Sequence, residues 1–161
     1  MTILHPEVAK ALSENGIRFE TLECDPADAD TAAFCARYGY PSDEVCNTII
    51  VVVKKTPREY VACLVRADTR LDVNHGVAAE VGFKRLSFAS PEETAQLSGM
   101  MIGGVTLIGL GEPMPILIDE LVLEKSAVIV GGGNRSSKVR LDPHELLKLP
   151  GARRAKIATG V

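Results

Sequence analysis

The sequence predicts an α/β protein of the α+β kind, in which a mixed, largely antiparallel sheet or partial barrel is surrounded by helices. Three observations support this prediction. Runs of apolar and β-branched residues typical of strands alternate irregularly with segments of helical periodicity. Several of the strands are joined by turns too short for a crossover helix, which favours antiparallel neighbours. The 161 residues, 46% of them hydrophobic, suffice for one core, so we expect a single domain over residues 1–161.

The N-terminal part of the chain predicts a strand between two helices. A helix is expected over residues 6–15, where proline occupies the first turn and glycine follows the last. Apolar residues alternate with charged ones over residues 17–21, which predicts a strand. A second helix is expected over residues 32–38, with Asp30 or Thr31 as its N-cap.

The middle of the chain predicts a buried hairpin. Residues 48–53 form an unbroken run, Thr-Ile-Ile-Val-Val-Val, typical of a central strand that is covered on both faces. A turn over residues 54–59 leads into a partner strand over residues 60–65. Asp72 is then a suitable N-cap for a helix over residues 73–81.

The C-terminal half predicts short strands between helices that begin with a capping box. A strand over residues 84–88 precedes a helix that starts at Ser90, has proline in its first position and ends at Gly99. Residues 142–145 repeat this pattern and open the last helix. Three further strands are expected at 116–119, 127–130 and 138–141.

The composition argues against several classes of protein. No apolar run approaches the roughly 20 residues that span a membrane, and residues 1–6 lack the pattern of a secretory signal, so we expect a cytoplasmic location. The net charge of −3 argues against a surface coated with basic residues for nonspecific nucleic-acid binding. Arg135, Lys138 and Arg140 form either a local basic patch or, as we favour, a solvated face.

The cysteines and histidines predict no metal site. Cys24, Cys35, Cys46 and Cys63 contain no CxxC pair, and the three histidines are scattered along the chain. Neither a phosphate-binding motif nor the order of a catalytic triad is present, and no cofactor is expected. We interpret the cysteines as reduced structural thiols, with a reactive Cys46 as the minor alternative.

A glycine-rich stretch from Gly103 to Gly111 is the strongest candidate for a binding site. Its glycines permit unusual backbone conformations and let a ligand approach the main chain closely. The apolar residues between them indicate that the stretch packs against the core. Two interpretations fit equally well, a pocket wall made of backbone and a hairpin or bulged strand that binds nothing.

Several segments, taken in order, resemble the YbaK/prolyl-tRNA-synthetase-associated family of aminoacyl-tRNA editing domains over nearly the whole chain. Residues 98–109 are similar to the substrate loop of the family, and residues 46–52 are similar to a strand that begins with a lysine there. Three other similar segments lie at 60–65, 116–120 and 130–135. Their order and spacing together carry the resemblance.

The resemblance implies a fold, a reaction and a partner. The implied fold is a mixed sheet wrapped by helices, and the implied reaction is hydrolysis of the ester between an amino acid and the terminal ribose of tRNA. In the family this work falls to backbone groups of the glycine loop, a lysine and groups of the substrate, which fits preorganised donors aimed at a developing oxyanion. The implied partners are the acceptor end of aminoacyl-tRNA and, as a further candidate, an aminoacyl-tRNA synthetase.

The resemblance also implies the residues of the site. Asn47 and Gly103 match the catalytic positions of the family. Asp119 fits a cap or turn at the end of its strand as well as a place near the pocket, and residues 131–133 fit a chain reversal as well as a lining. The matched substrate-binding positions are Gly103, Gly104, Val105, Thr106, Leu107, Asp119, Gly131, Gly132 and Gly133.

Two departures from the family pattern leave two functions open. The lysine of the family falls on Asn47, which carries no charge, and its loop proline falls on Leu107, which does not stiffen the loop. The first hypothesis is a trans-acting deacylase that hydrolyses mischarged tRNA. The alternative is a catalytically degenerate module of the same fold that binds aminoacyl-tRNA or a small ligand. A thiol-dependent enzyme that uses Cys46 is a third, weaker hypothesis.

Overall fold

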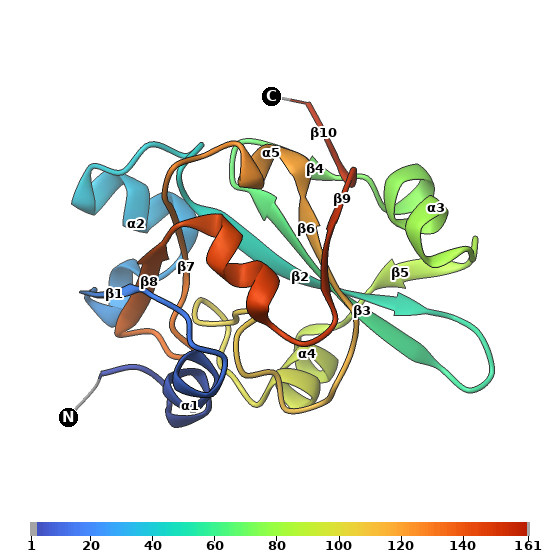
Figure 1. Ribbon diagram of the computed structural model, residues 1–161, viewed down its shortest axis with the longest axis horizontal. Coiled ribbons are helices and arrows are strands. Elements are labelled where there is room, and N and C mark those ends of the chain that lie inside the picture. The colour runs from blue at the N-terminus through green and yellow to red at the C-terminus, as the bar shows by residue number, and fades with distance from the viewer. Residues whose placement is uncertain (1–2, 161) are drawn as a thin grey trace.

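The computed structural model describes residues 3–160 and has a five-stranded mixed sheet at its centre. The strands of this sheet are β2 (Cys46–Val53), β3 (Glu59–Arg66), β5 (Leu86–Phe88), β6 (Ile116–Asp119) and β9 (Ala152–Ala155). They lie in the order β5–β2–β3–β6–β9 (Figure 1). β2 pairs antiparallel with β3 and β5, whereas β6 pairs parallel with β3 and β9. Met1, Thr2 and Val161, which the predicted domain includes, lie outside the described residues.

A second, three-stranded antiparallel sheet lies beside the start of β2. Its strands, in spatial order, are β1 (Glu20–Glu23), β8 (Ser137–Leu141) and β7 (Val128–Gly131). A parallel bridge between Val45 and Ile129 connects this sheet to the segment that enters β2. β4 (Arg70–Leu71) and β10 (Ala158–Thr159) form a separate antiparallel pair.

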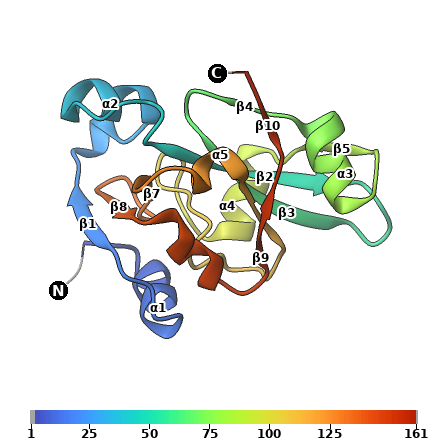
Figure 2. The ribbon, with the colours of Figure 1, turned by 45° about the horizontal axis from the view of Figure 1, so that its top comes forward.

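Helices lie around these sheets (Figure 1, Figure 2). The α-helices are α1 (Pro6–Glu14), α2 (Thr31–Tyr38), α3 (Ala78–Val81), α4 (Pro91–Ser98) and α5 (Glu120–Leu123). A π-helical turn (Val73–Val77) precedes α3, and 3₁₀ helices occupy Pro26–Asp28 and Pro143–Lys148. The predicted mixed sheet surrounded by helices is therefore confirmed, and the sheets do not close into a barrel.

Side-chain caps start several helices at the residues that the sequence indicates. The Ser90 hydroxyl accepts a hydrogen bond from the Glu93 amide at 3.1 Å. The Asp142 carboxylate accepts one from the His144 amide at 2.9 Å. These bonds satisfy main-chain donors that the first turn of a helix leaves unpaired, so both helices begin where predicted.

The β2–β3 hairpin is buried on both faces. Val51 and Cys63 belong to one apolar cluster, and Ala62 and Leu64 belong to another that α1 and Leu107 share. Because neither face of residues 50–53 and 61–65 meets water, these parts of the strands carry apolar residues without alternation. The buried central hairpin that the β-branched run predicts is thus confirmed.

The structure also differs from the expected elements at some positions. The strand expected over residues 17–21 begins only at Glu20, because the Ile17 amide donates to the Leu12 carbonyl and completes the turn after α1. The sequence does not predict α5, β9 or β10. β9 reads Ala-Arg-Arg-Ala, which has no apolar run, and it is a strand because it pairs with β6. The last helix is of the 3₁₀ type.

Candidate active site

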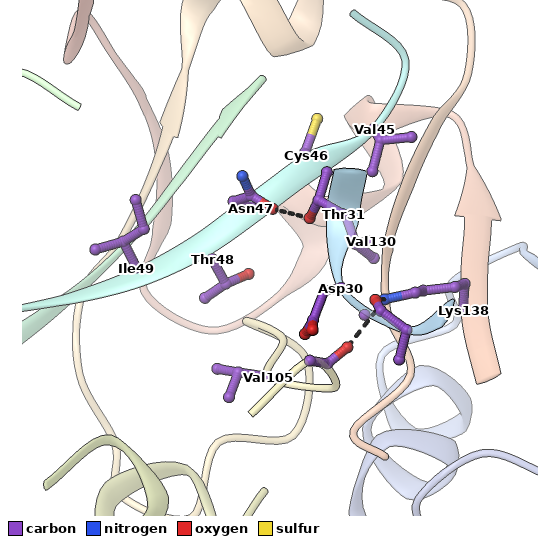
Figure 3. A pocket seen from close by; sticks show the side chains of 13 residues that line it. Asp30, Thr31, Val45, Cys46, Asn47, Thr48, Ile49, Val105, Val130 and Lys138 are labelled. Carbon is purple, nitrogen blue, oxygen red and sulfur yellow. Dashed lines mark hydrogen bonds between the residues drawn. The ribbon is translucent and has the colours of Figure 1, made fainter. Parts of the chain in front are cut away.

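A pocket of about 280 Å³ opens beside the first half of β2. Its walls come from parts of the chain that are distant in sequence (Figure 3). Asn47 and Thr48 of β2 form one side, Thr31 at the start of α2 borders it, and Val105 of the glycine-rich stretch lies opposite. Gly103 of the same stretch also lines the pocket. β7 and β8 complete the lining.

The β2 wall presents main-chain groups of the strand. β5 pairs only with residues 51–53, and the parallel bridge lies before the strand at Val45, so no ladder covers the edge between them in the described chain. The Ile50 carbonyl accepts from the Ala89 amide at 2.9 Å on this side. Because the direction of main-chain groups repeats at every second residue, the N–H and C=O of Thr48 point to the same open edge. Thr48 therefore offers one donor and one acceptor to the pocket.

The side chains of this wall offer further polar groups. The Thr48 hydroxyl is buried and has no hydrogen-bond partner among the described residues. The Thr31 hydroxyl donates to Asn47 Oδ1 at 2.6 Å, which leaves the Asn47 amide N–H groups for a ligand (Figure 3). A buried polar group without a partner costs about 1–3 kcal/mol. A ligand that pairs with the Thr48 hydroxyl would recover part of that cost.

The opposite wall is the start of the glycine-rich stretch, and the carbonyls there are already paired within the protein. The three successive carbonyls of residues 102–104 each accept a hydrogen bond. The donors are Arg135 Nη1 at 2.8 Å, Lys138 Nζ at 3.0 Å and the Gly133 amide at 2.7 Å, respectively. The two groups of a trans peptide point in opposite directions, so the Val105 amide points away from Gly133. That amide makes no hydrogen bond within the described chain and remains available as a donor.

Lys138 is the cation that lines the pocket in the described chain, and it is only 6% exposed. Its ammonium donates to the Ala29 carbonyl at 2.7 Å and to the Gly103 carbonyl, and it lies 5.5 Å from the centre of the Phe34 ring. Burial lowers the pKa of this ammonium, and the neighbouring Arg135 lowers it further. The interpretation of Lys138 as part of a solvated face is wrong, because its side chain turns inward between the loop that contains Ala29 and the loop that contains Gly103.

The structure brings Asn47, Gly103, Val105 and Gly131 together at the pocket. Gly131 ends β7, and a β-carbon there would lie 2.6 Å from the Val105 carbonyl oxygen. Glycine is therefore required for the loop to approach β7 this closely. These four residues are the part of the predicted site that forms one cavity.

Five other predicted residues lie behind this cavity. The backbone of Gly104, Gly132 and Gly133 lies directly against Asn134, Ser137 and His5, respectively. Thr106 and Leu107 are buried in the core, with exposures of 0% and 1%. The Gly132 carbonyl accepts a hydrogen bond from the His5 amide at 3.0 Å. These residues hold the loop in place and do not line the pocket.

Asp119 also lies outside the pocket lining. Its carboxylate is 1% exposed and accepts hydrogen bonds from the Leu121, Ile157 and Ala158 amides at 3.1, 2.9 and 3.0 Å. The first bond caps α5 and the other two attach the C-terminal segment to the sheet. The structure thus gives Asp119 the role of a cap, one of the two roles that the sequence left open.

Cys46 lies at the pocket but is poorly suited to nucleophilic attack. Burial raises the pKa of its thiol to about 12, so little thiolate exists at neutral pH. The sulfur also points away from the groups that line the cavity around Thr48 (Figure 3). Among residues 3–160, no group of three or more His, Cys, Asp and Glu side chains is arranged to hold a metal ion.

Thr31, Thr48 and Lys138 are pocket residues that the sequence did not indicate as a site. The sequence predicts that Thr48 lies in a buried strand, but an open strand edge depends on where the neighbouring strands stop. The sequence indicates Thr31 only as a helix cap. Lys138 lies in a predicted strand with no local pattern that marks it as buried. Their assembly depends on contacts between segments far apart in the chain, which a single sequence does not display.

Comparison with known proteins defines the class of protein first. Residues 25–149 match the family model described as the aminoacyl-tRNA editing domain. The match covers most of the chain, and this chain therefore belongs to the aminoacyl-tRNA editing domain family. The resemblance inferred from the ordered segments is confirmed.

Individual relatives are consistent with this assignment. EbsC of Enterococcus faecalis, a proposed Cys-tRNA(Pro)/Cys-tRNA(Cys) deacylase, is 26% identical over 121 residues, which cover 75% of this chain and 72% of the relative. A solved structure of a proposed trans-editing enzyme for prolyl-tRNA synthetase matches with a TM-score of 0.83 and 28% identity, over 98% of this chain and 99% of the other. The structure of a hypothetical protein matches with a TM-score of 0.85 and 24% identity, over 95% and 99%, and shows the same fold.

These findings support a hydrolase of the aminoacyl-tRNA editing class. They also agree with the mixed sheet flanked by helices that the sequence predicts. In the described part of the chain, no helix combines the length and the apolar character needed to cross a membrane.

Proposed function

We propose that this protein is a trans-acting deacylase that hydrolyses the ester bond of mischarged aminoacyl-tRNA. The observation that carries the proposal is the pocket between the open edge of β2 and the glycine-rich stretch, with a main-chain donor and acceptor at Thr48 on one wall and a main-chain donor at Val105 on the other. Membership of the editing family supports the reaction class. The similarity to a protein described as a trans-editing enzyme supports action on tRNA that is not bound to a synthetase.

In the proposed complex, the acceptor end of aminoacyl-tRNA places its ester between the two walls. The α-ammonium of the amino acid donates to the Thr48 carbonyl, and the Asn47 amide group donates to a hydroxyl of the terminal ribose. The Val105 amide donates to the ester carbonyl oxygen as negative charge develops on it. Donors that are fixed before the reaction stabilise this charge without reorganisation.

The proposed reaction uses water as the nucleophile. Water adds to the ester carbonyl carbon, the bond between that carbon and the ribose oxygen breaks, and a proton passes to the ribose oxygen. The products are a free amino acid and a tRNA with a free terminal hydroxyl. The Cys46 thiol remains protonated at neutral pH, which supports attack by water rather than by this side chain.

A panel of mischarged tRNAs tests the proposal. The purified protein is incubated with each tRNA in the absence of any synthetase, and the release of amino acid is compared with spontaneous hydrolysis. We expect faster release from at least one tRNA, and we expect Asn47→Ala to slow it. Asn74→Ala, which changes an exposed asparagine that does not line the pocket, is the matched control. If no member of a broad panel is deacylated, the proposal fails.

The neutral side chain of Asn47 favours a second candidate, a degenerate module that binds aminoacyl-tRNA or a small ligand without turnover. It predicts that an aminoacyl-adenosine analogue binds while hydrolysis stays at the spontaneous rate. Asn47→Lys distinguishes the two candidates. A gain of hydrolysis would support degeneration, whereas loss of an existing activity would support a site adapted to asparagine.

A synthetase partner and a cytoplasmic location belong to the same proposal. A deacylase that acts in trans has to reach mischarged tRNA soon after the synthetase releases it. Pull-down of prolyl-tRNA synthetase by the full chain, measured with and without tRNA, tests this association. Recovery of the synthetase at the level of an unrelated control protein would remove it.

A further inference from the structure

A single charged group connects the two loops that border the pocket. The Lys138 ammonium donates to the Ala29 carbonyl at 2.7 Å, in the loop before α2, and to the Gly103 carbonyl at 3.0 Å, in the glycine-rich stretch. Lys138 itself comes from β8, a third segment (Figure 3). Its side chain therefore bridges the rim of the pocket from behind.

The charge of Lys138 is not balanced by an ion pair within the described residues. Its ammonium donates to main-chain carbonyls, and the nearby Asp30 pairs with Arg135 at 3.1 Å. Burial of an ammonium costs several kcal/mol unless strong hydrogen bonds offset the cost. An apolar side chain of the same length would fill this space without that penalty. The presence of a cation here indicates a need for strong donors at both carbonyls.

The hydrogen bond from Lys138 acts on the middle of three fixed peptides. The carbonyls before and after that of Gly103 are held by Arg135 and by the Gly133 amide. Arg135 is partly exposed and Gly133 contributes a main-chain donor, so Lys138 is the buried side-chain donor of the three. Its removal would leave the Gly103 carbonyl unpaired and would also release the Ala29 loop.

We propose that Lys138 is a positioning residue of the deacylation site, whose ammonium holds the Gly103 loop against the Ala29 loop and so fixes the width of the pocket. This inference rests on the proposed function for its catalytic consequence. Lys138 acts through Gly103 and Val105 and does not itself attack the substrate. A shift of the Val105 amide by about 1 Å is enough to cost about 100-fold in rate, because a donor must match the position of the developing oxyanion.

Hydrogen–deuterium exchange without substrate tests the structural part. Lys138→Met keeps the length of the side chain and removes the donors. We expect exchange of main-chain amides in the two loops, residues 27–33 and 101–109, to become about 10-fold faster or more, while β3 stays protected. Arg140→Met is the matched control, since Arg140 lies on the same strand and is 41% exposed at its side chain, and it should leave both loops unchanged.

Deacylation kinetics test the catalytic part. For Lys138→Met we expect kcat to fall about 10- to 100-fold with KM within about threefold, because positioning rather than affinity is lost. Lys138→Arg keeps a charged donor and should restore part of the kcat. Arg140→Met should match the unaltered protein in both parameters. Equal loss in the Arg and Met variants, or a change in KM alone, would contradict a positioning role.

The two tests fail independently. If exchange in both loops is the same in Lys138→Met and in the unaltered protein, the inference about Lys138 is overturned, whatever the activity. If the unaltered protein deacylates nothing while exchange responds as expected, the proposed function fails and the structural role stands. If Lys138→Met does not fold by circular dichroism, Lys138→Gln is measured instead, and unchanged exchange in its two loops overturns the inference.

Discussion

The two halves of the glycine-rich stretch are fixed by different forces. Gly103 and Val105 border the pocket, and side-chain and main-chain donors from the segment around β8 hold the carbonyls of residues 102–104. Residues 106–108 are buried, with Thr106 and Ile108 at 0% exposure and Leu107 at 1%. One half is held by hydrogen bonds at the edge of a cavity, and the other half is held by apolar packing.

This difference explains why the stretch combines glycines with large apolar residues. A β-carbon on Gly104 would lie 2.3 Å from the Asn134 carbonyl oxygen, so residue 104 can lie this close to the segment before β8 only as glycine. Leu107 packs in the cluster that contains α1 and one face of the hairpin. The packed half anchors the loop, and the hydrogen-bonded half carries the groups that meet a ligand.

The largest effect is expected from Leu107→Ala, which tests the packed half. Removal of a fully buried leucine should lower the free energy of unfolding by about 2–5 kcal/mol in urea titrations. Folded protein should retain most of its deacylation rate, since Leu107 does not line the pocket. Leu110→Ala, at a partly exposed neighbour, is the control and should cost less. A large loss of rate with little loss of stability would reverse the assignment of the two halves.

Gly104→Ala tests the hydrogen-bonded half and should give the next largest effect. The added methyl group meets the main chain of Asn134 and has to displace the loop. We expect kcat for deacylation to fall about 100-fold, because the Val105 amide moves with the loop. Gly111→Ala is the matched control, since its nearest atom, the Leu97 carbonyl oxygen, would be 3.3 Å away. Equal rates for the two variants would contradict the comparison.

The sequence predicts much of the fold. It predicts only part of the division of the glycine-rich stretch into a half at the pocket and a half packed in the core. The β2–β3 hairpin follows from uninterrupted apolar runs, which are a local signal. The resemblance placed Asn47, Gly103, Val105 and Gly131 at a site, and the structure brings them to one pocket. The sequence does not separate the first half of the glycine-rich stretch from the second, because that separation depends on which long-range partners each residue meets.

Lys138 shows the same limit more clearly. In the sequence Lys138 lies in a segment with two arginines, a pattern that favours a solvated face. Its burial results from the way β8 passes behind the loops of Ala29 and Gly103. Likewise, β9 becomes a strand only because β6 is present beside it. Both features are tertiary, so neither local periodicity nor composition indicates them.

A smaller effect is expected from Thr48→Val. This variant tests whether the β2 wall of the pocket contributes to substrate affinity, whereas the loop wall contributes to kcat. Valine has nearly the shape of threonine without the unpaired hydroxyl, so the free energy of unfolding should stay equal or increase. If the hydroxyl pairs with the substrate, KM should rise about 10-fold while kcat changes little. Thr48→Ser retains the hydroxyl and should keep KM near its original value. A fall in kcat alone would assign to Thr48 a role that we give to the loop.

The smallest effect concerns Cys46. Its thiol is the pocket side chain that could act as a nucleophile in place of water, which would contradict a site built from main-chain groups. Burial raises the pKa of the Cys46 and Cys63 thiols to about 12 from 9.0. Between these values the unfolded chain loses the thiol protons and the folded chain keeps them. The stability that each thiol contributes is therefore fully present below pH 9 and is lost as the pH rises toward 12.

Two alanine variants separate stability from catalysis at these thiols. Cys46→Ala and Cys63→Ala should each reduce the loss of unfolding free energy between pH 8 and pH 10 by about 1 kcal/mol in urea titrations. Both should keep the deacylation rate within about threefold at neutral pH, since neither thiol supplies the nucleophile. Cys63 is the matched control because it is also buried and does not line the pocket. Loss of activity in Cys46→Ala alone would place the nucleophile on its sulfur and would remove water from that role.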